Sequence, residues 1–95
     1  MGAMNVTVKA FADFRELLGK ELSLSVPEST TVRELLQILG ANHAEFYSKV
    51  LNNDGNQQPY VNILMNGRNI RSLGGLQTAL SDGDVLAIFS PVAGG

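Results

Sequence analysis

Two stretches near the start of the chain alternate between apolar and polar side chains with a period of two. Residues 5–11 read NVTVKAF, and residues 21–26 read ELSLSV. This period is typical of strands that bury one face and leave the other exposed. Both stretches are therefore predicted to be strands, and Gly19-Lys20 is expected to reverse the chain so that the strands pair as a hairpin.

A short helical turn is predicted between these strands, at residues 13–18. Asp13 and Glu16 have the spacing of a capping box, and Gly19 follows where such a turn would end. Two further helix starts have the same spacing, at Thr31 with Glu34 and at Asn42 with Glu45. The three pairs predict where three helical segments begin.

The main helix is predicted over residues 32–39. Its apolar positions fall at i, i+3, i+4 and i+7 and form one stripe: Val32, Leu35, Leu36 and Leu39. Such a stripe can bind a partner, but at helical spacing it belongs more often to the core, and we assign it to the core. Gly40 ends this helix, and Phe46, Val50 and Leu51 continue an apolar face in the next one.

The second half of the chain contains three more predicted strands. YVNILM at 60–65 precedes Asn66-Gly67, a dipeptide typical of a two-residue hairpin turn, and a short strand is expected to return around 69–70. Residues 73–80 are expected to be an irregular or 3₁₀ connection. Their Gly74-Gly75 could suggest a phosphate loop, but no Gly-Lys-Ser/Thr follows, so a turn is the preferred interpretation. VLAIFS at 85–90 is apolar on both faces, as in a central strand of a covered sheet.

This order of elements predicts an α+β fold of the β-grasp, or ubiquitin-like, type. We expect a mixed sheet of four to five strands, with the last strand beside the first and one main helix packed across it. Residues 1–3 are interpreted as an expression scar, residues 4–90 as the β-grasp domain and residues 91–95 as an extended, functional tail.

Composition narrows the classes of function. The 95 residues are 44% hydrophobic and 17% charged with a net charge of −2, which fits one globular domain and gives no basic stripe for nucleic acid. No membrane span or signal peptide pattern is present, so we expect a cytoplasmic protein. Cysteine is absent and His43 is the only histidine, so neither a thiol nucleophile nor a metal site is expected.

The end of the chain carries the best candidate for chemistry. Pro91, Val92 and Ala93 lead to Gly94-Gly95, and five residues reach at most ~18 Å. Because glycine has no side chain, such a tail could enter a narrow active site and present the carboxylate of Gly95. ATP used by a partner enzyme would activate this carboxylate by adenylation, after which a sulfur donor or a lysine amine could attack. No cofactor bound by the chain itself is expected.

Four segments resemble the small subunit of molybdopterin synthase, in the MoaD/ThiS sulfur-carrier family: FADFRELLG, VRELLQIL, VNILMNGRNI and LSDGDVLAIFSPVAGG. The resemblance implies adenylation of Gly95 by an enzyme related to ubiquitin E1, thiocarboxylate formation, and insertion of the tail into the large synthase subunit for sulfur delivery to precursor Z. Many members have a proline where this chain has Ser90.

The resemblance also implies partner contacts for Phe11 and Phe89, which match an apolar docking patch, although ordinary sheet packing explains them equally well. Arg15 matches the family's Arg-Glu-Leu segment, and we expect its role to be structural. Two other functions stay open. The chain could be a modifier joined to target lysines, or a carrier for tRNA thiolation or thiamine synthesis. A plain ubiquitin-like interaction domain, in which the tail is incidental, is the third alternative.

Overall fold

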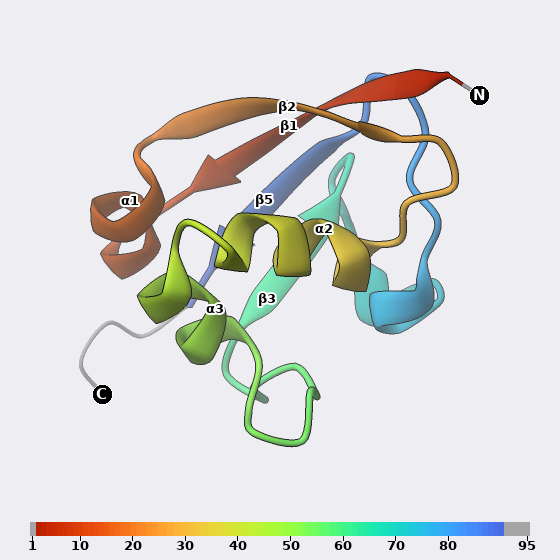
Figure 1. Ribbon diagram of the computed structural model, residues 1–95. Coiled ribbons are helices and arrows are strands. Elements are labelled where there is room, and N and C mark those ends of the chain that lie inside the picture. The colour runs from red at the N-terminus through yellow and green to blue at the C-terminus, as the bar shows by residue number, and fades with distance from the viewer. Residues whose placement is uncertain (1, 91–95) are drawn as a thin grey trace.

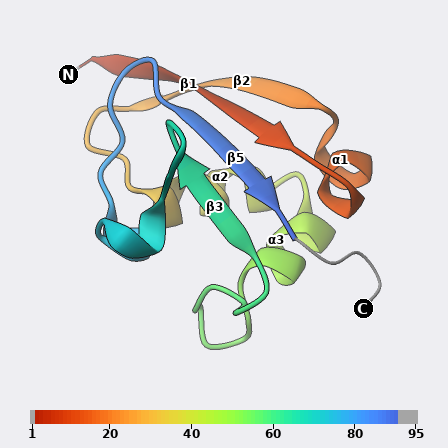
Figure 2. The ribbon, with the colours of Figure 1, turned by 180° about the vertical axis from the view of Figure 1, so that it is seen from behind.

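The computed structural model of the chain describes residues 2–90. Its strands are β1 (Ala3–Ala10), β2 (Glu21–Pro27), β3 (Asn62–Met65), β4 (Arg68–Asn69) and β5 (Val85–Phe89). Its helices are α1 (Asp13–Leu18), α2 (Val32–Gly40) and α3 (Ala44–Val50), with 3₁₀ turns η1 (Ile70–Ser72) and η2 (Gly75–Gln77). The strands form a sheet in the order β2-β1-β5-β3-β4, in which β1 and β5 run parallel (Figure 1 and Figure 2). The predicted β-grasp roll is confirmed.

The first two strands form the predicted antiparallel hairpin. Their register runs from Ala3 opposite Pro27 to Lys9 opposite Glu21. β1 thus begins at Ala3, one residue before the predicted start of the domain at residue 4 and within the segment 1–3 that was interpreted as an expression scar. The strand can use Ala3 because pairing needs only backbone groups, whatever the origin of residues 1–3; that origin stays a prediction.

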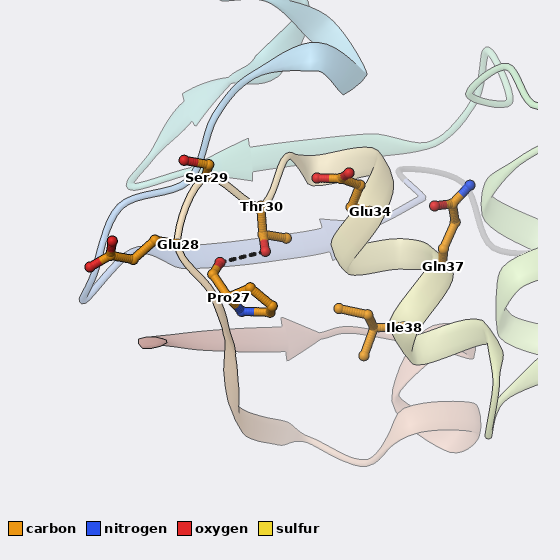
Figure 3. Close-up of a pocket in the computed structure, with 7 residues that line it drawn as sticks. All are labelled: Pro27, Glu28, Ser29, Thr30, Glu34, Gln37 and Ile38. Carbon is orange, nitrogen blue, oxygen red and sulfur yellow. Dashed lines mark hydrogen bonds between the residues drawn. The ribbon is translucent and has the colours of Figure 1, made fainter. Parts of the chain in front are cut away.

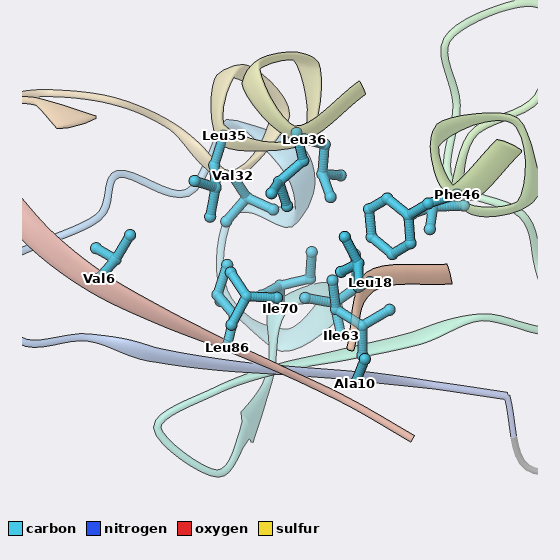
Figure 4. Packing of buried hydrophobic residues seen from close by; sticks show 14 of the residues in the cluster. Val6, Ala10, Leu18, Val32, Leu35, Leu36, Phe46, Ile63, Ile70 and Leu86 are labelled. Atoms are coloured by element: carbon cyan, nitrogen blue, oxygen red, sulfur yellow. The ribbon is translucent and has the colours of Figure 1, made fainter. Parts of the chain in front are cut away.

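Helix α2 begins at the predicted capping box. Thr31 Oγ1 accepts a hydrogen bond from Glu34 N at 3.2 Å, and Glu34 Oε1 accepts one from Thr31 N at 3.0 Å. The predicted apolar stripe is fully buried, so its assignment to the core is confirmed. Figure 4 shows the α2 side chains facing residues of the sheet; the labelled core residues are Val6, Ala10, Leu18, Val32, Leu35, Leu36, Phe46, Ile63, Ile70 and Leu86.

The other two predicted capping boxes are wrong. Ala12 is the N-cap of α1 and His43 is the N-cap of α3, and neither has a side-chain capping hydrogen bond. The chain turns at Ala12, which is the N-cap, so Asp13 is the first residue inside α1 and cannot itself be the cap. Its carboxylate therefore lies in the first turn, where it still interacts favourably with the positive end of the helix.

Strand β5 lies between β1 and β3, as predicted for a central strand. However, only Leu86 and Ile88 are buried, while Val85, Ala87 and Phe89 are half-buried. The expectation of a covered sheet is therefore wrong: α2 and α3 lie on one face, and Figure 2 shows the other face in front of them. Burial in the core therefore does not explain why the β5 residues on this open face are apolar.

The hairpin of β3 and β4 has the predicted Asn66-Gly67 turn. Both residues have positive φ, 52° at Asn66 and 86° at Gly67, as a type I′ turn requires. The turn places Asn66 beside the start of β5, where its backbone N–H donates to Val85 O at 2.8 Å.

Candidate functional site

The last strand delivers the chain to the predicted tail. β5 ends at Phe89, and Ser90 follows as the last residue that the structure describes. The tail positions predicted to act, which are Pro91, Val92, Ala93, Gly94 and Gly95, lie outside the described residues. The described part of the site is therefore the surface around the end of β5.

Phe11 and Phe89 lie against each other at this end of the sheet. β1 and β5 are parallel neighbours, so the residues at their C-terminal ends come together. Phe11 N also donates to Ile88 O at 3.3 Å, which continues the pairing beyond β1. The ring centroids are 6.4 Å apart and the planes meet at 89°, an edge-to-face contact. Phe11 nevertheless remains 39% exposed, so the pair is packed and accessible at once.

An open apolar hollow of about 450 Å³ surrounds this aromatic pair. Its lining residues are Phe11, Ala12, Leu64, Ala87, Phe89 and Ser90. Leu64 and Ala87 are register partners on β3 and β5, so they lie on the same open face of the sheet as Phe89. Among the lining residues that the structure describes, Ser90 is the only one with a polar side chain. The hollow is therefore suited to an apolar contact with another molecule and not to proton transfer.

Arg15 supports the exposed ring of this pair from α1. Its Cζ atom lies 5.7 Å from the centroid of the Phe11 ring, within the range of a cation–π interaction. Its Nε donates to Ala10 O at 3.4 Å, which ties the guanidinium to the end of β1. Arg15 thus touches both the backbone and the ring that precede the turn into α1.

Ala12 makes that turn with an unusual backbone. Its φ of 53° and ψ of −127° lie where glycine is favoured, and a Cβ atom in this region adds strain. The turn brings Ala12 beside Phe11 in the lining of the hollow. Strain stored next to a partly exposed aromatic residue is typical of surfaces under functional constraint.

Three residues that line the hollow are not among the site residues predicted from the sequence: Ala12, Leu64 and Ala87. The sequence does carry a signal for Leu64 and Ala87. Strands β3 and β5 have apolar residues at successive positions, and successive side chains of a strand point to opposite faces of the sheet, so one of each apolar pair has to lie on the open face. Ile63 and Ile88 are buried, so Leu64, Ala87 and Phe89 could have been assigned to the open face. Nothing local in the sequence indicates the backbone of Ala12.

Residues 2–90 contain no group of three or more histidine, aspartate or glutamate side chains placed to hold a metal ion. His43, the only histidine, occupies the N-cap position of α3 and belongs to no such group. In the same part of the chain, none of the helices has the length and apolar character needed to cross a membrane.

Comparison with known proteins identifies relatives along the whole chain. The model of the ThiS family matches residues 8–95. Small archaeal modifier protein 3 of Haloferax volcanii is 40% identical over 93 residues, which is 97% of this chain and all of the relative. Sulfur carrier protein CysO of Mycobacterium tuberculosis is 34% identical over 94 residues, again 97% of this chain and all of the relative.

Solved structures have the same fold. Small archaeal modifier protein 1 of Methanosarcina acetivorans has a TM-score of 0.82 at 34% identity, over the full length of both chains. A putative molybdopterin converting factor, subunit 1, of Pyrococcus furiosus has a TM-score of 0.75 at 35% identity, over 94% of this chain and 99% of that one. CysO of Amycolatopsis orientalis, solved as a complex with BexX, has a TM-score of 0.77 at 30% identity, over 95% of this chain and 99% of that one.

The fold and these full-length matches agree with one another. The chain belongs to the ThiS family, the ubiquitin-like family of sulfur carriers and small modifiers.

Proposed function

We propose that this protein is the sulfur-carrying small subunit of a molybdopterin synthase and that it works through the carboxylate of Gly95. A carboxylate oxygen attacks the α-phosphorus of ATP in an activating enzyme related to ubiquitin E1, and pyrophosphate leaves. A sulfur donor then displaces AMP from the acyl adenylate and leaves a thiocarboxylate. The large synthase subunit accepts the charged tail, and the sulfur passes to precursor Z during formation of the dithiolene.

The observation that carries this proposal is the hollow around Phe11 and Phe89. It combines a partly exposed aromatic pair with an apolar lining, and it lies where β5 leads into the tail. Aromatic residues in such shallow apolar sites often anchor protein partners. A partner that docks here would have the root of the tail at its own surface, so docking and tail insertion can occur together.

The chemistry of the described residues supports a carrier that depends on a partner. Within residues 2–90, the lining of the hollow offers no acid, base or nucleophile apart from the Ser90 hydroxyl, and the chain has no cysteine. Adenylation and sulfur transfer therefore have to be catalysed by the partner enzymes. The likeness to the Pyrococcus furiosus molybdopterin converting factor supports the choice of synthase among the possible acceptors.

The test is to incubate the full chain with its cognate activating enzyme, ATP and a sulfur donor, and to measure the intact mass. We expect one oxygen of the C-terminal carboxylate to be replaced by sulfur. A variant without Gly94-Gly95 is the control, and its melting temperature is measured beside that of the full chain. An unchanged mass of the full chain with an active enzyme would contradict the proposal.

A second candidate function is modification of target proteins through an isopeptide bond from Gly95 to lysine. The 40% identity with a small archaeal modifier protein over its full length favours this candidate. The test is to search digests of whole cells for lysines that carry a Gly-Gly remnant derived from this chain. If no such lysines are found in cells that make molybdopterin, the modifier function is excluded and only the carrier function remains.

A further inference from the structure

The free edge of β2 has backbone groups that point away from the sheet. Ala10 N donates to Lys20 O at 3.1 Å, and this bond sets the phase of the β1–β2 ladder so that even-numbered residues of β2 pair with β1. The N–H and C=O groups of Ser23 and Ser25 therefore face outward along the edge of the sheet. Such an edge can accept an additional strand from another chain.

A groove of about 550 Å³ opens beside this edge, between the end of β2 and the outer side of α2 (Figure 3). Its lining residues are Pro27, Glu28, Ser29, Thr30, Glu34, Gln37 and Ile38. Thr30 Oγ1 donates to Pro27 O at 2.6 Å, which fixes the turn that leads from β2 to α2. Figure 3 shows Ile38 projecting from α2 toward Pro27 across the groove.

The margin of the core next to the groove is incompletely covered. Leu22 and Leu24 lie on the helix side of β2 but are only half-buried against the core. Ile38 is 41% exposed, although the neighbouring α2 residues Leu35 and Leu36 are fully buried. An added strand beside β2 would place alternate side chains over these apolar groups and remove them from water.

The charges of the groove select the kind of segment that would fit. Its lining contains the carboxylate of Glu34, and the lining residues described by the structure include no lysine, arginine or histidine. Glu34 Oε1 accepts from Thr31 N, and a carboxylate has capacity for further donors. An incoming lysine or arginine would complement this charge, whereas an acidic segment would be repelled.

The groove and the hollow around Phe11 lie apart. Pro27 pairs with Ala3 at the start of β1, whereas Phe11 and Phe89 meet beyond its other end. The groove also lies on the side of the sheet that faces α2, whereas the hollow is on the open face. A ligand in the groove would leave the end of β5 accessible to a second partner.

We propose that the edge of β2 and the adjoining groove bind an extended segment of a partner protein, in which apolar side chains are flanked by lysine or arginine. The segment adds to the sheet as a strand and pairs with the backbone of Ser23 and Ser25. Its apolar side chains cover Leu24 and Ile38, and a flanking basic side chain approaches Glu34. This interaction does not depend on the chemistry of the tail.

The test is a titration of the isotope-labelled full chain with the capped peptide Lys-Val-Ile-Val-Lys, followed by NMR. We expect amide shifts that concentrate in β2 and around Ile38, and slower hydrogen exchange at the amides of Ser23 and Ser25. The capped peptide Glu-Val-Ile-Val-Glu should bind about tenfold more weakly or worse because it meets the carboxylate of Glu34 in the groove.

Two variants and one control make the test specific. Ile38→Asp removes the apolar contact, and Ser25→Pro removes an outward N–H that β1 does not use; each should weaken binding about tenfold or more. Tyr60→Asp is the matched control, because Tyr60 is 54% exposed and does not line the groove. Unchanged amide shifts in β3 and β5, which do not pair with β2, confirm that each variant is folded.

Three results would overturn the proposal. The first is equal binding of the acidic and basic peptides. The second is the absence of shifts in β2 at millimolar peptide, or their appearance around Phe11 instead. The third is protection of the Ser23 and Ser25 amides that rises with protein concentration without peptide, since the edge would then pair with a second copy of the chain.

Discussion

Asn66 and Asp84 are joined by a hydrogen bond of 2.8 Å from Asn66 Nδ2 to Asp84 Oδ1. Asp84 Oδ2 also accepts from Ser81 N at 2.7 Å, and Asn66 Oδ1 accepts from Val85 N at 3.0 Å. These bonds connect the β3–β4 turn to the Asp-Gly-Asp turn that begins β5. They hold the start of β5 in register with β3.

Replacing Asp84 by alanine should destabilise the fold by about 2–4 kcal/mol, because the side chain is buried and two donors lose their charged acceptor. Urea denaturation measures this loss. Asp82→Ala is the matched control: Asp82 accepts from Asn5 N at 2.7 Å in an exposed position, so about 1 kcal/mol or less should be lost. Equal losses in the two variants would contradict the role assigned to Asp84.

Much of the fold could be predicted because its signals are local. The period-two alternation of the first two strands, the capping box at Thr31 and the Asn66-Gly67 turn each need only a few neighbouring residues, and all are confirmed. The caps of α1 and α3 could not be predicted from spacing alone. Ala12 starts α1 with a backbone conformation that the preceding strand imposes, and alanine carries no signal for it.

The candidate site could be predicted only in part, because it is assembled from distant segments. Phe11 and Phe89 were singled out by resemblance, but their contact requires the parallel pairing of β1 with β5. The groove beside β2 gives no sequence signal either. Ile38 is an apolar residue next to a buried helical stripe, and the sequence alone does not show that it stays exposed.

Ala12→Gly should stabilise the protein by up to about 1 kcal/mol. Glycine relieves the strain of a positive φ with ψ of −127°, and this gain is partly offset by the greater freedom of glycine in the unfolded chain. Thermal and urea denaturation measure the change. Ala12→Val should have the opposite sign because a branched side chain increases the strain. A loss of stability in Ala12→Gly would show that the strain at Ala12 is smaller than the entropic cost of placing glycine there.

Arg15 and Phe11 should be energetically coupled. The guanidinium lies 5.7 Å from the ring centroid, so a double-mutant cycle with Arg15→Ala and Phe11→Ala should give a coupling of about 0.5–1 kcal/mol. Arg15→Lys keeps the charge but loses the planar group that donates to Ala10 O, so it should retain only part of this coupling. A coupling near zero would mean that the contact contributes nothing to stability.

Phe11→Ala and Phe89→Ala should impair thiocarboxylate formation far more than folding. Each variant removes an aromatic anchor from the hollow, and we expect kcat/KM of the cognate activating enzyme for the carrier to fall about tenfold or more. Stability should fall by only about 1–2 kcal/mol, because Phe11 is exposed and Phe89 is half-buried. The rate is measured by intact mass over time at saturating ATP.

Tyr60→Ala is the control for this experiment, since Tyr60 is an exposed aromatic residue outside the hollow and its loss should leave the rate unchanged. The two phenylalanine variants should also be non-additive when combined, because the rings pack edge to face with their centroids 6.4 Å apart. Full activity of both single variants, or an equal loss in Tyr60→Ala, would exclude the hollow as the surface that the activating enzyme recognises.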